Sequence, residues 1–296
     1  MKIAVTGITG QVVTSLLERG QIAGHEVIAI GRPDLDLADP ASVTRALEAT
    51  GPDVIVSAAA YTAVDKAESE SDLAFAVNGA GAGAVAQAAK KLGVPVIHIS
   101  TDYVFDGTLD RPYVEGDPTG PTGVYGASKL AGEQAVLATY AENSAVLRVA
   151  WVYSPFGGNF VKTMLRLAGD RDEVSVVADQ VGNPTSALAI ADGIIQVATN
   201  MVADGSPALR GIFHMTASGE ASWADFAQAI FAASAARGGP SASVRPIGTA
   251  DYPTPATRPA NSRLDSGKIA RIHGVTLPDW RASLDEVMDR LQPAAS

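Results

Sequence analysis

The chain has 296 residues, of which 22 are basic and 32 acidic, so its formal net charge is −10. This acidic balance argues against a protein that binds the phosphate backbone of nucleic acids. Apolar residues make up 47% of the chain and charged residues 18%, which excludes wholesale disorder and leaves enough apolar side chains for a large core. There is no cysteine, so disulfides and thiolate catalysis are excluded.

No segment has the pattern of a targeting or membrane sequence. The apolar run that begins at Met1 is too short for a signal peptide and is interrupted by Gly7. The longest apolar stretches, 54–60 and 145–151, fall far short of the roughly 20 residues that a membrane helix needs. We therefore expect a cytoplasmic protein with no membrane partner.

Short apolar segments alternate with helical patterns over the first 150 residues. Parallel strands need crossover connections that cover the sheet, so this alternation predicts an α/β fold with a doubly wound parallel sheet of Rossmann type. The expected strands are 3–6, 25–30, 53–59, 95–100 and 145–152, and the expected helices are 12–20, 43–49, 73–92 and 128–140.

The alternation loosens after residue 152. A helix at 186–200 and a strand at 212–215 are expected to return to the main sheet, while further helices are expected at 160–168, 222–236 and 281–291. We therefore divide the chain into a dinucleotide-binding domain and a smaller carboxyl-terminal α/β lobe that binds substrate. The first comprises 1–150 with 186–215, and the second comprises 151–185 with 216–296.

A glycine-containing loop joins the first strand to the first helix. Gly7 permits a tight turn, and Gly10 lets the backbone approach a phosphate without a Cβ in the way. Gln11 and Val12 then open the helix, where backbone amides and the helix dipole favour a dinucleotide pyrophosphate. The alternative is an ordinary turn between a strand and a helix, and Val13 replaces a third glycine of the pattern.

The end of the second strand carries an arginine where an NAD site usually carries an acid. The Arg32 guanidinium suits a 2′-phosphate, which favours NADP over NAD. The alternative is a solvated arginine in a loop. Asp36 and Leu37 follow and are candidates to contact the adenine, although Asp36 is equally consistent with a turn residue.

The pair Tyr125 and Lys129 is the most informative feature of the sequence, because residues four apart share one face of a helix. A nearby cation favours the ionised phenol and lowers its pKa, so the pair predicts a proton donor for a carbonyl that receives hydride. Thr101 and Asp102 follow an apolar strand, which places them at the carboxyl edge of the sheet, where such folds bind ligands.

Together these features resemble the extended short-chain dehydrogenase/reductase family, and longer runs are similar to the dTDP-4-dehydrorhamnose reductases within it. The similarity covers nearly the whole chain. The matching runs are 53–68, 100–107, 124–126, 130–133, 151–153, 159–164, 179–182 and 252–259.

The resemblance implies an NADPH-dependent enzyme, with NADH as a possible cofactor. It would reduce the 4-keto group of dTDP-4-dehydro-L-rhamnose to dTDP-L-rhamnose, for cell-surface polysaccharides such as lipopolysaccharide. Tyr125 would donate the proton, Thr101 would help to polarise the ketone, and Lys129 would hold the nicotinamide ribose and lower the pKa of Tyr125.

The resemblance also implies the remaining binding residues. Besides the glycine loop, Tyr125 and Lys129, the residues that would contact the cofactor are Ala58, Ala59, Ala60 and Asn78. Those that would contact the sugar nucleotide are Thr62, Val64, Asp102, Tyr103, Trp151 and Arg258. Arg258 is the candidate clamp for the diphosphate, because a guanidinium offers paired donors to phosphate oxygens. The alternatives are a core aromatic residue for Trp151 and a solvated loop residue for Arg258.

Some family members dimerise through carboxylates near the helix at 186–200, with a magnesium ion between subunits. Here residues 186–190 contain no acid, and the first is Asp192. We therefore predict no structural metal, and a monomer or weak homodimer.

Two other functions remain open from the sequence. One is a reductase, epimerase or dehydratase that acts on another nucleotide sugar, although Tyr103 stands where family dehydratases typically carry a glutamate. The other is a non-catalytic, NADP-binding regulatory subunit.

Overall fold

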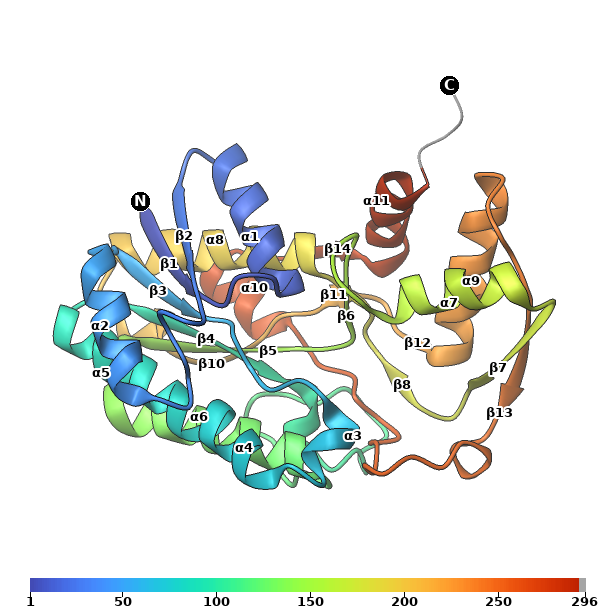
Figure 1. Cartoon of the computed structure of the whole chain (residues 1–296), viewed down its shortest axis with the longest axis horizontal. Helices are drawn as coiled ribbons and strands as arrows, with labels where there is room; N and C mark the ends of the chain where they lie inside the picture. Colours follow the sequence, from blue (N-terminus) through green and yellow to red (C-terminus); the bar gives the residue numbers. More distant parts are fainter. Residues whose placement is uncertain (293–296) are drawn as a thin grey trace.

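A six-stranded parallel sheet lies at the centre of the computed structural model, which describes residues 1–292 (Figure 1). Strands β3 and β4 are buried along their whole length, which explains why they are mostly apolar and do not alternate between apolar and polar residues. In the order β10-β5-β4-β3-β1-β2, the strands are β10 (Gly211–His214), β5 (Ser144–Val149), β4 (Val96–Thr101), β3 (Val54–Ser57), β1 (Lys2–Thr6) and β2 (Glu26–Ile30).

Helices cover both faces of this sheet, which confirms the doubly wound α/β fold. One face is covered by α1 (Gln11–Ile22) and α8 (Ala187–Ala203), and the other by α2 (Pro40–Thr50), α5 (Gly81–Leu92) and α6 (Val124–Tyr140). Each layer forms its own apolar core with the sheet. The strand at 211–214 lies beside β5, as expected for a segment that returns to the main sheet.

The helix predicted over 73–92 is present, but it is not a regular α-helix throughout. The chain forms α4 (Ser71–Phe75), a π-helical turn over Ala76–Ala80 and then α5. Asn78 lies in the π turn, where its side chain accepts a hydrogen bond from Tyr61 N (2.8 Å) and donates one to Tyr61 O (3.0 Å). The extra residue in this turn therefore lets a buried side chain fix the segment that follows β3, beside the short helix α3 (Val64–Ala67).

The smaller part of the chain, on the right in Figure 1, has a separate apolar core. We keep the two-lobe division as a proposal that this second core supports. Its helices are α7 (Phe160–Asp170), α9 (Trp223–Ala236) and α11 (Trp280–Leu291), with α10 (Gly267–His273) packed near β10. Its short strand pairs are β7 (Glu173–Val177) with β13 (Ser243–Ile247), β8 (Val181–Gly182) with β12 (Ala221–Ser222), β6 (Val152–Tyr153) with β9 (Thr185–Ser186), and β11 (Ala217–Ser218) with β14 (Leu277–Asp279).

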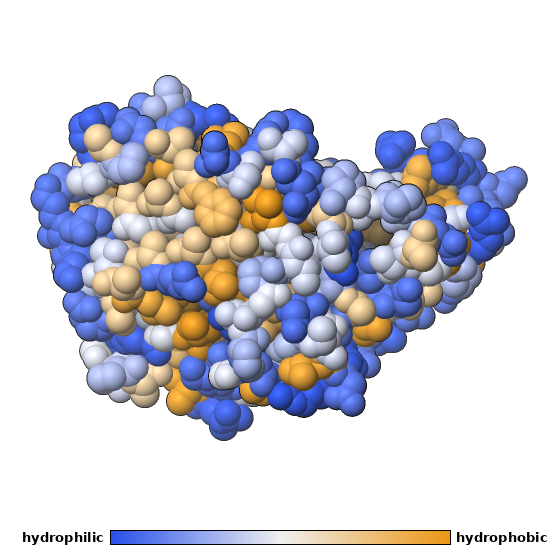
Figure 2. Space-filling model, turned by 90° about the horizontal axis from the view of Figure 1, so that it is seen from below, coloured by the Kyte–Doolittle hydropathy of each residue, from blue (hydrophilic) through white to orange (hydrophobic). Residues whose placement is uncertain are grey.

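The face of the molecule seen in Figure 2 has apolar residues in its middle and hydrophilic residues around its margin. Two exposed apolar side chains, Leu73 and Phe75, belong to α4. Across residues 1–292, no helix combines the length and the apolar character needed to cross a membrane.

Candidate active site

A cleft of about 1160 Å³ opens at the carboxyl ends of the parallel strands. Parallel sheets of this kind bind ligands at this edge, so its position agrees with the sequence prediction. Of the predicted site residues, those that line the cleft are Gly7, Gly10, Gln11, Val12, Arg32, Asp36, Leu37, Ala58, Ala59, Ala60, Thr62, Val64, Thr101, Asp102, Tyr103, Tyr125, Lys129 and Trp151.

The glycine loop is shaped to accept a phosphate group. Gly7 has a positive φ of 103°, and a Cβ on it would lie 3.2 Å from Val13 Cγ2. Gly10 is the N-cap residue of α1, and no side chain caps this helix end. Since the first amides of α1 open into the cleft without a side-chain partner, the residues present fit a dinucleotide pyrophosphate.

Arg32 lies on the cleft wall after β2 and is exposed to solvent. Asp36 and Leu37 line the same end of the cleft. The Asp36 carboxylate accepts a hydrogen bond from Ala38 N (3.0 Å), so Asp36 shapes the turn as well as lining the cleft. Because Arg32 is exposed on this wall, its guanidinium is accessible to a ligand, as the prediction of a 2′-phosphate site requires.

Tyr125 and Lys129 lie in the first two turns of α6 and both face the cleft. Gly126 brings this helix close to the segment after β4, because a Cβ on Gly126 would lie 2.2 Å from Tyr103 O. The Tyr125 ring meets the Tyr103 ring edge to face, with centroids 5.8 Å apart. Lys129 is buried, and its Nζ donates a hydrogen bond to Ile99 O (2.7 Å).

The pKa of Tyr125 differs from the prediction. Burial raises this pKa to about 12, the negative charge of Asp102 acts in the same direction, and Thr101 acts against it. The expected lowering by Lys129 is not seen, because the low-dielectric surroundings disfavour the phenolate more than the ammonium favours it. Tyr125 is therefore a neutral phenol at pH 7, which is the form that donates a proton.

Thr101 and Asp102 form a hydrogen-bonded pair at the end of β4. Thr101 Oγ1 donates to Asp102 Oδ1 (2.8 Å) and accepts from Tyr103 N (3.2 Å). Asp102 is 3% exposed, and its Oδ2 is buried without a hydrogen-bond partner among the residues described. Burial raises the pKa of Asp102 to about 7.

An aromatic wall closes the cleft on the side of the smaller lobe, and we define it as Trp151, Trp223 and Phe160. The Trp151 and Trp223 rings are stacked, with centroids 3.5 Å apart and planes 4° apart. Trp151 has a positive φ of 47°, a strained conformation for a side chain of this size, and a Cβ on Gly182 would lie 2.4 Å from its ring. Trp151 therefore has little free ring face, and Trp223 covers much of it.

Sequence reasoning gave no role to Trp223, Phe160 or Asn159, which all line the cleft. Phe160 and Asn159 belong to a run that carried the family resemblance, whereas nothing in the sequence around Trp223 pointed to the cleft. Asn159 caps α7 and donates hydrogen bonds to Gln11 Oε1 (3.0 Å) and Ser154 O (2.8 Å), so it joins α7 to the start of α1.

Two predicted site residues do not line the cleft. Asn78 is buried behind it and donates a hydrogen bond to Ser128 Oγ (2.9 Å), so it supports α6. Arg258 makes a two-pronged ion pair with Asp65, at 3.1 Å and 2.8 Å. This pair ties the segment between β13 and α10 to α3, and the role of Arg258 as a diphosphate clamp stays a prediction.

The first acid of α8, the helix on which the prediction about a metal depends, contacts an arginine. Asp192 of α8 lies 3.5 Å from Arg19 Nε. Within residues 1–292, no three histidine or acidic side chains group to hold a metal ion.

Comparison with known proteins identifies the family to which the chain belongs. The family model described as the RmlD substrate binding domain matches residues 1–293. A dTDP-4-dehydrorhamnose reductase of Sinorhizobium fredii is 52% identical over 283 residues, which cover 96% of this chain and 95% of that protein. The chain belongs to the dTDP-4-dehydrorhamnose reductase family.

Solved structures of family members agree closely with this fold. A dTDP-4-dehydrorhamnose reductase of Clostridium acetobutylicum has a TM-score of 0.91 at 37% identity, and the match covers 99% of this chain and 100% of that one. The Bacillus anthracis enzyme, solved in complex with NADP, has a TM-score of 0.89 at 34% identity, over 97% and 98% of the two chains. The family resemblance seen in the sequence is thus confirmed.

Proposed function

We infer that this chain is an NADPH-dependent oxidoreductase that reduces the 4-keto group of dTDP-4-dehydro-L-rhamnose to dTDP-L-rhamnose. The observation that carries this inference is the placement of neutral Tyr125 and buried Lys129 in the cleft that the glycine loop also lines. Relatives at high identity over nearly the full length carry the same activity in their names, and one family structure holds NADP.

The chain's own residues bind both ligands and move one proton. The amides after Gly10 bind the pyrophosphate, and Lys129 holds the ribose next to the nicotinamide. When bound, NADPH supplies the hydride that reduces the keto carbon. Tyr125 Oη gives its proton to the keto oxygen, which becomes a hydroxyl, and the positive charge of Lys129 stabilises the phenolate left behind.

For the sugar nucleotide we propose contacts with Thr62, Val64, Asp102, Tyr103 and Trp151, all on the cleft wall. We propose that Thr101 helps to polarise the ketone, since its side chain acts on the Tyr125 hydroxyl, which would donate the proton. The protein then works on a small-molecule substrate, and a monomer or weak homodimer stays our prediction for its assembly.

The test uses NADPH that is deuterated at the transferable position, incubated with the purified protein and dTDP-4-dehydro-L-rhamnose. We expect one deuterium at the former keto carbon of the product, detected by mass spectrometry and NMR. An epimerase or dehydratase that recycles a bound cofactor would leave the product free of deuterium, which would contradict the proposal.

Replacing Arg32 with alanine is expected to weaken NADPH use by about tenfold in kcat/KM, because an exposed charge-assisted bond to the 2′-phosphate is lost. The kcat/KM for NADH, which lacks that phosphate, should stay within about twofold. Steady-state kinetics with each cofactor varied measures both values. An equal loss with the two cofactors would show that Arg32 does not recognise the 2′-phosphate.

Replacing Trp223 with alanine is expected to raise the KM for the sugar nucleotide about tenfold, since an aromatic pair contributes about 0.5–1.5 kcal/mol beyond its buried area. The KM for NADPH should change little, because none of the residues proposed to bind the cofactor belongs to this wall. Trp223→Phe keeps an aromatic ring and serves as the matched control. A rise in the NADPH KM alone would refute a role for Trp223 on the substrate side.

A further inference from the structure

A buried ion pair lies directly behind the proposed catalytic lysine. Glu133 of α6 is 1% exposed and Arg148 of β5 is 2% exposed. Arg148 Nε donates to Glu133 Oε1 (2.9 Å), and Arg148 Nη2 donates to Glu133 Oε2 (2.7 Å). A buried ion pair stabilises the folded state little more than apolar side chains of similar volume would. Its place beside the active site therefore indicates a role other than stability.

Glu133 follows Lys129 by one helical turn, so the two side chains share a face of α6. Other ionisable groups lie near Lys129. They are Tyr125 on the same helix, His98 and Arg148 on the neighbouring strands, and Asp102, which lines the cleft and whose charge acts on Tyr125. Burial and the charge of Lys129 hold the pKa of His98 well below its usual range, so His98 is neutral. Glu133 is therefore the negative charge that faces Lys129 from inside the protein.

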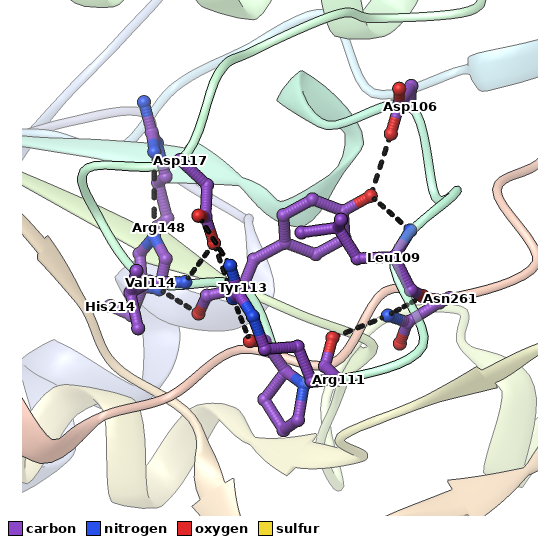
Figure 3. A network of polar contacts seen from close by, with 10 residues as sticks. Asp106, Leu109, Arg111, Tyr113, Val114, Asp117, Arg148, His214 and Asn261 are labelled. Atoms are coloured by element: carbon purple, nitrogen blue, oxygen red, sulfur yellow. Dashed lines mark hydrogen bonds and ion pairs between the residues drawn. The ribbon is translucent and has the colours of Figure 1, made fainter.

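Arg148 is held in place by His214, which contacts its guanidinium (Figure 3). Tyr113 O lies 3.1 Å from His214 Nδ1, and a carbonyl only accepts, so Nδ1 carries the ring proton. Nε2 of the neutral ring then accepts from Arg148 Nη1 at 3.5 Å. The guanidinium also lies over the Phe105 ring, 4.9 Å from its centroid. These contacts aim the guanidinium at Glu133.

Glu133 also accepts a hydrogen bond from β4, the strand that carries Thr101. Ser100 Oγ donates to Glu133 Oε1 (2.5 Å), and Ser100 precedes Thr101 on β4. The carboxylate is thus held between α6, β4 and β5, with both oxygens bonded and its charge fixed close to Lys129.

We propose that Glu133 is a positioning residue that keeps Lys129 protonated during catalysis, and that Arg148 holds Glu133 in place. The inference rests on the proposed function, because it acts through the Tyr125 and Lys129 pair. It means that a side chain with no contact to the cleft sets the pH range in which Tyr125 transfers its proton.

The direction of the effect follows from the charges. Burial lowers the pKa of Lys129 to about 8, and the charge of Glu133 acts against this lowering. Lys129 is therefore charged below about pH 8 and loses its charge as the pH rises. If Glu133 is made neutral, the pKa of Lys129 falls further, and the support for the Tyr125 phenolate is lost at a lower pH.

The test measures the single-turnover rate of NADPH oxidation against pH for the wild type, Glu133→Gln and the double variant Glu133→Gln/Arg148→Met. We expect the basic limb of both variants to move down by about one pH unit, with rates near that of the wild type at the acidic end. The double variant removes both charges of the Glu133–Arg148 pair, so neither is left buried without the other. It therefore keeps the proposal testable if Glu133→Gln alone folds poorly.

Glu48→Gln is the matched control, since Glu48 pairs with Lys91 far from the cleft, and its profile should equal that of the wild type. A folded double variant with the wild-type basic limb would overturn the inference. A wild type that does not oxidise NADPH with the sugar nucleotide would instead refute the proposed function, so the two failures are distinguishable.

Discussion

Tyr125→Phe is expected to reduce the rate of NADPH oxidation by about 10²- to 10⁴-fold, the usual contribution of a general acid. The substitution removes only the hydroxyl, so no group is left to protonate the keto oxygen. The ring keeps its edge-to-face contact with Tyr103, at 5.8 Å between centroids. The dissociation constant of NADPH, measured by fluorescence titration, should therefore stay near the wild-type value.

Tyr153→Phe provides the control for this prediction. The Tyr153 hydroxyl donates to Trp280 O (3.1 Å) in the core of the smaller lobe, away from the cleft. Its loss should cost about 1 kcal/mol of stability and leave turnover intact. If Tyr125→Phe kept the wild-type rate while binding NADPH, Tyr125 would not be the acid.

Arg148→Met is expected to lower the free energy of unfolding by about 3–5 kcal/mol, because it leaves the Glu133 carboxylate buried without its partner. Within the part of the chain that the structure describes, the hydrogen bond from Ser100 is the one that would remain to that carboxylate. In the double variant Glu133→Gln/Arg148→Met both charges of this pair are removed together, so the loss should fall to within about 2 kcal/mol. Urea denaturation followed by circular dichroism measures all three proteins.

Arg245→Met, which replaces an arginine on the surface, is the control for the loss of stability expected in Arg148→Met. Arg245 is 64% exposed in its side chain and pairs only loosely with Glu173, at 3.7 Å. Arg245→Met should change the free energy of unfolding by less than about 1 kcal/mol. An Arg148→Met protein as stable as Arg245→Met would show that the buried pair does not hold this part of the core.

Local patterns were sufficient to predict the sheet and the centre of the site. The apolar runs of β3 and β4 and the helices between them required a parallel sheet with covered faces, and this placed Thr101 at the edge where ligands bind. The four-residue spacing of Tyr125 and Lys129 put both on one face of a helix. These inferences depended on residues that are close in the sequence.

Features that depend on distant segments could not be predicted in the same way. Arg258 is recognisable as a loop arginine, but its partner Asp65 is 193 residues away. Trp223 reaches the cleft only because α9 packs its first residue against Trp151. The pKa of Tyr125 was predicted from its charged neighbour alone, whereas burial, which a sequence does not display, decides its direction.

The most direct test of the proposed activity is the loss of NADPH absorbance at about 340 nm when the purified protein is mixed with dTDP-4-dehydro-L-rhamnose. We predict that one NADPH is oxidised for each dTDP-L-rhamnose formed. A folded protein that binds NADPH yet leaves the absorbance unchanged with this substrate would contradict the assignment, and would direct attention to another nucleotide sugar or to a regulatory role.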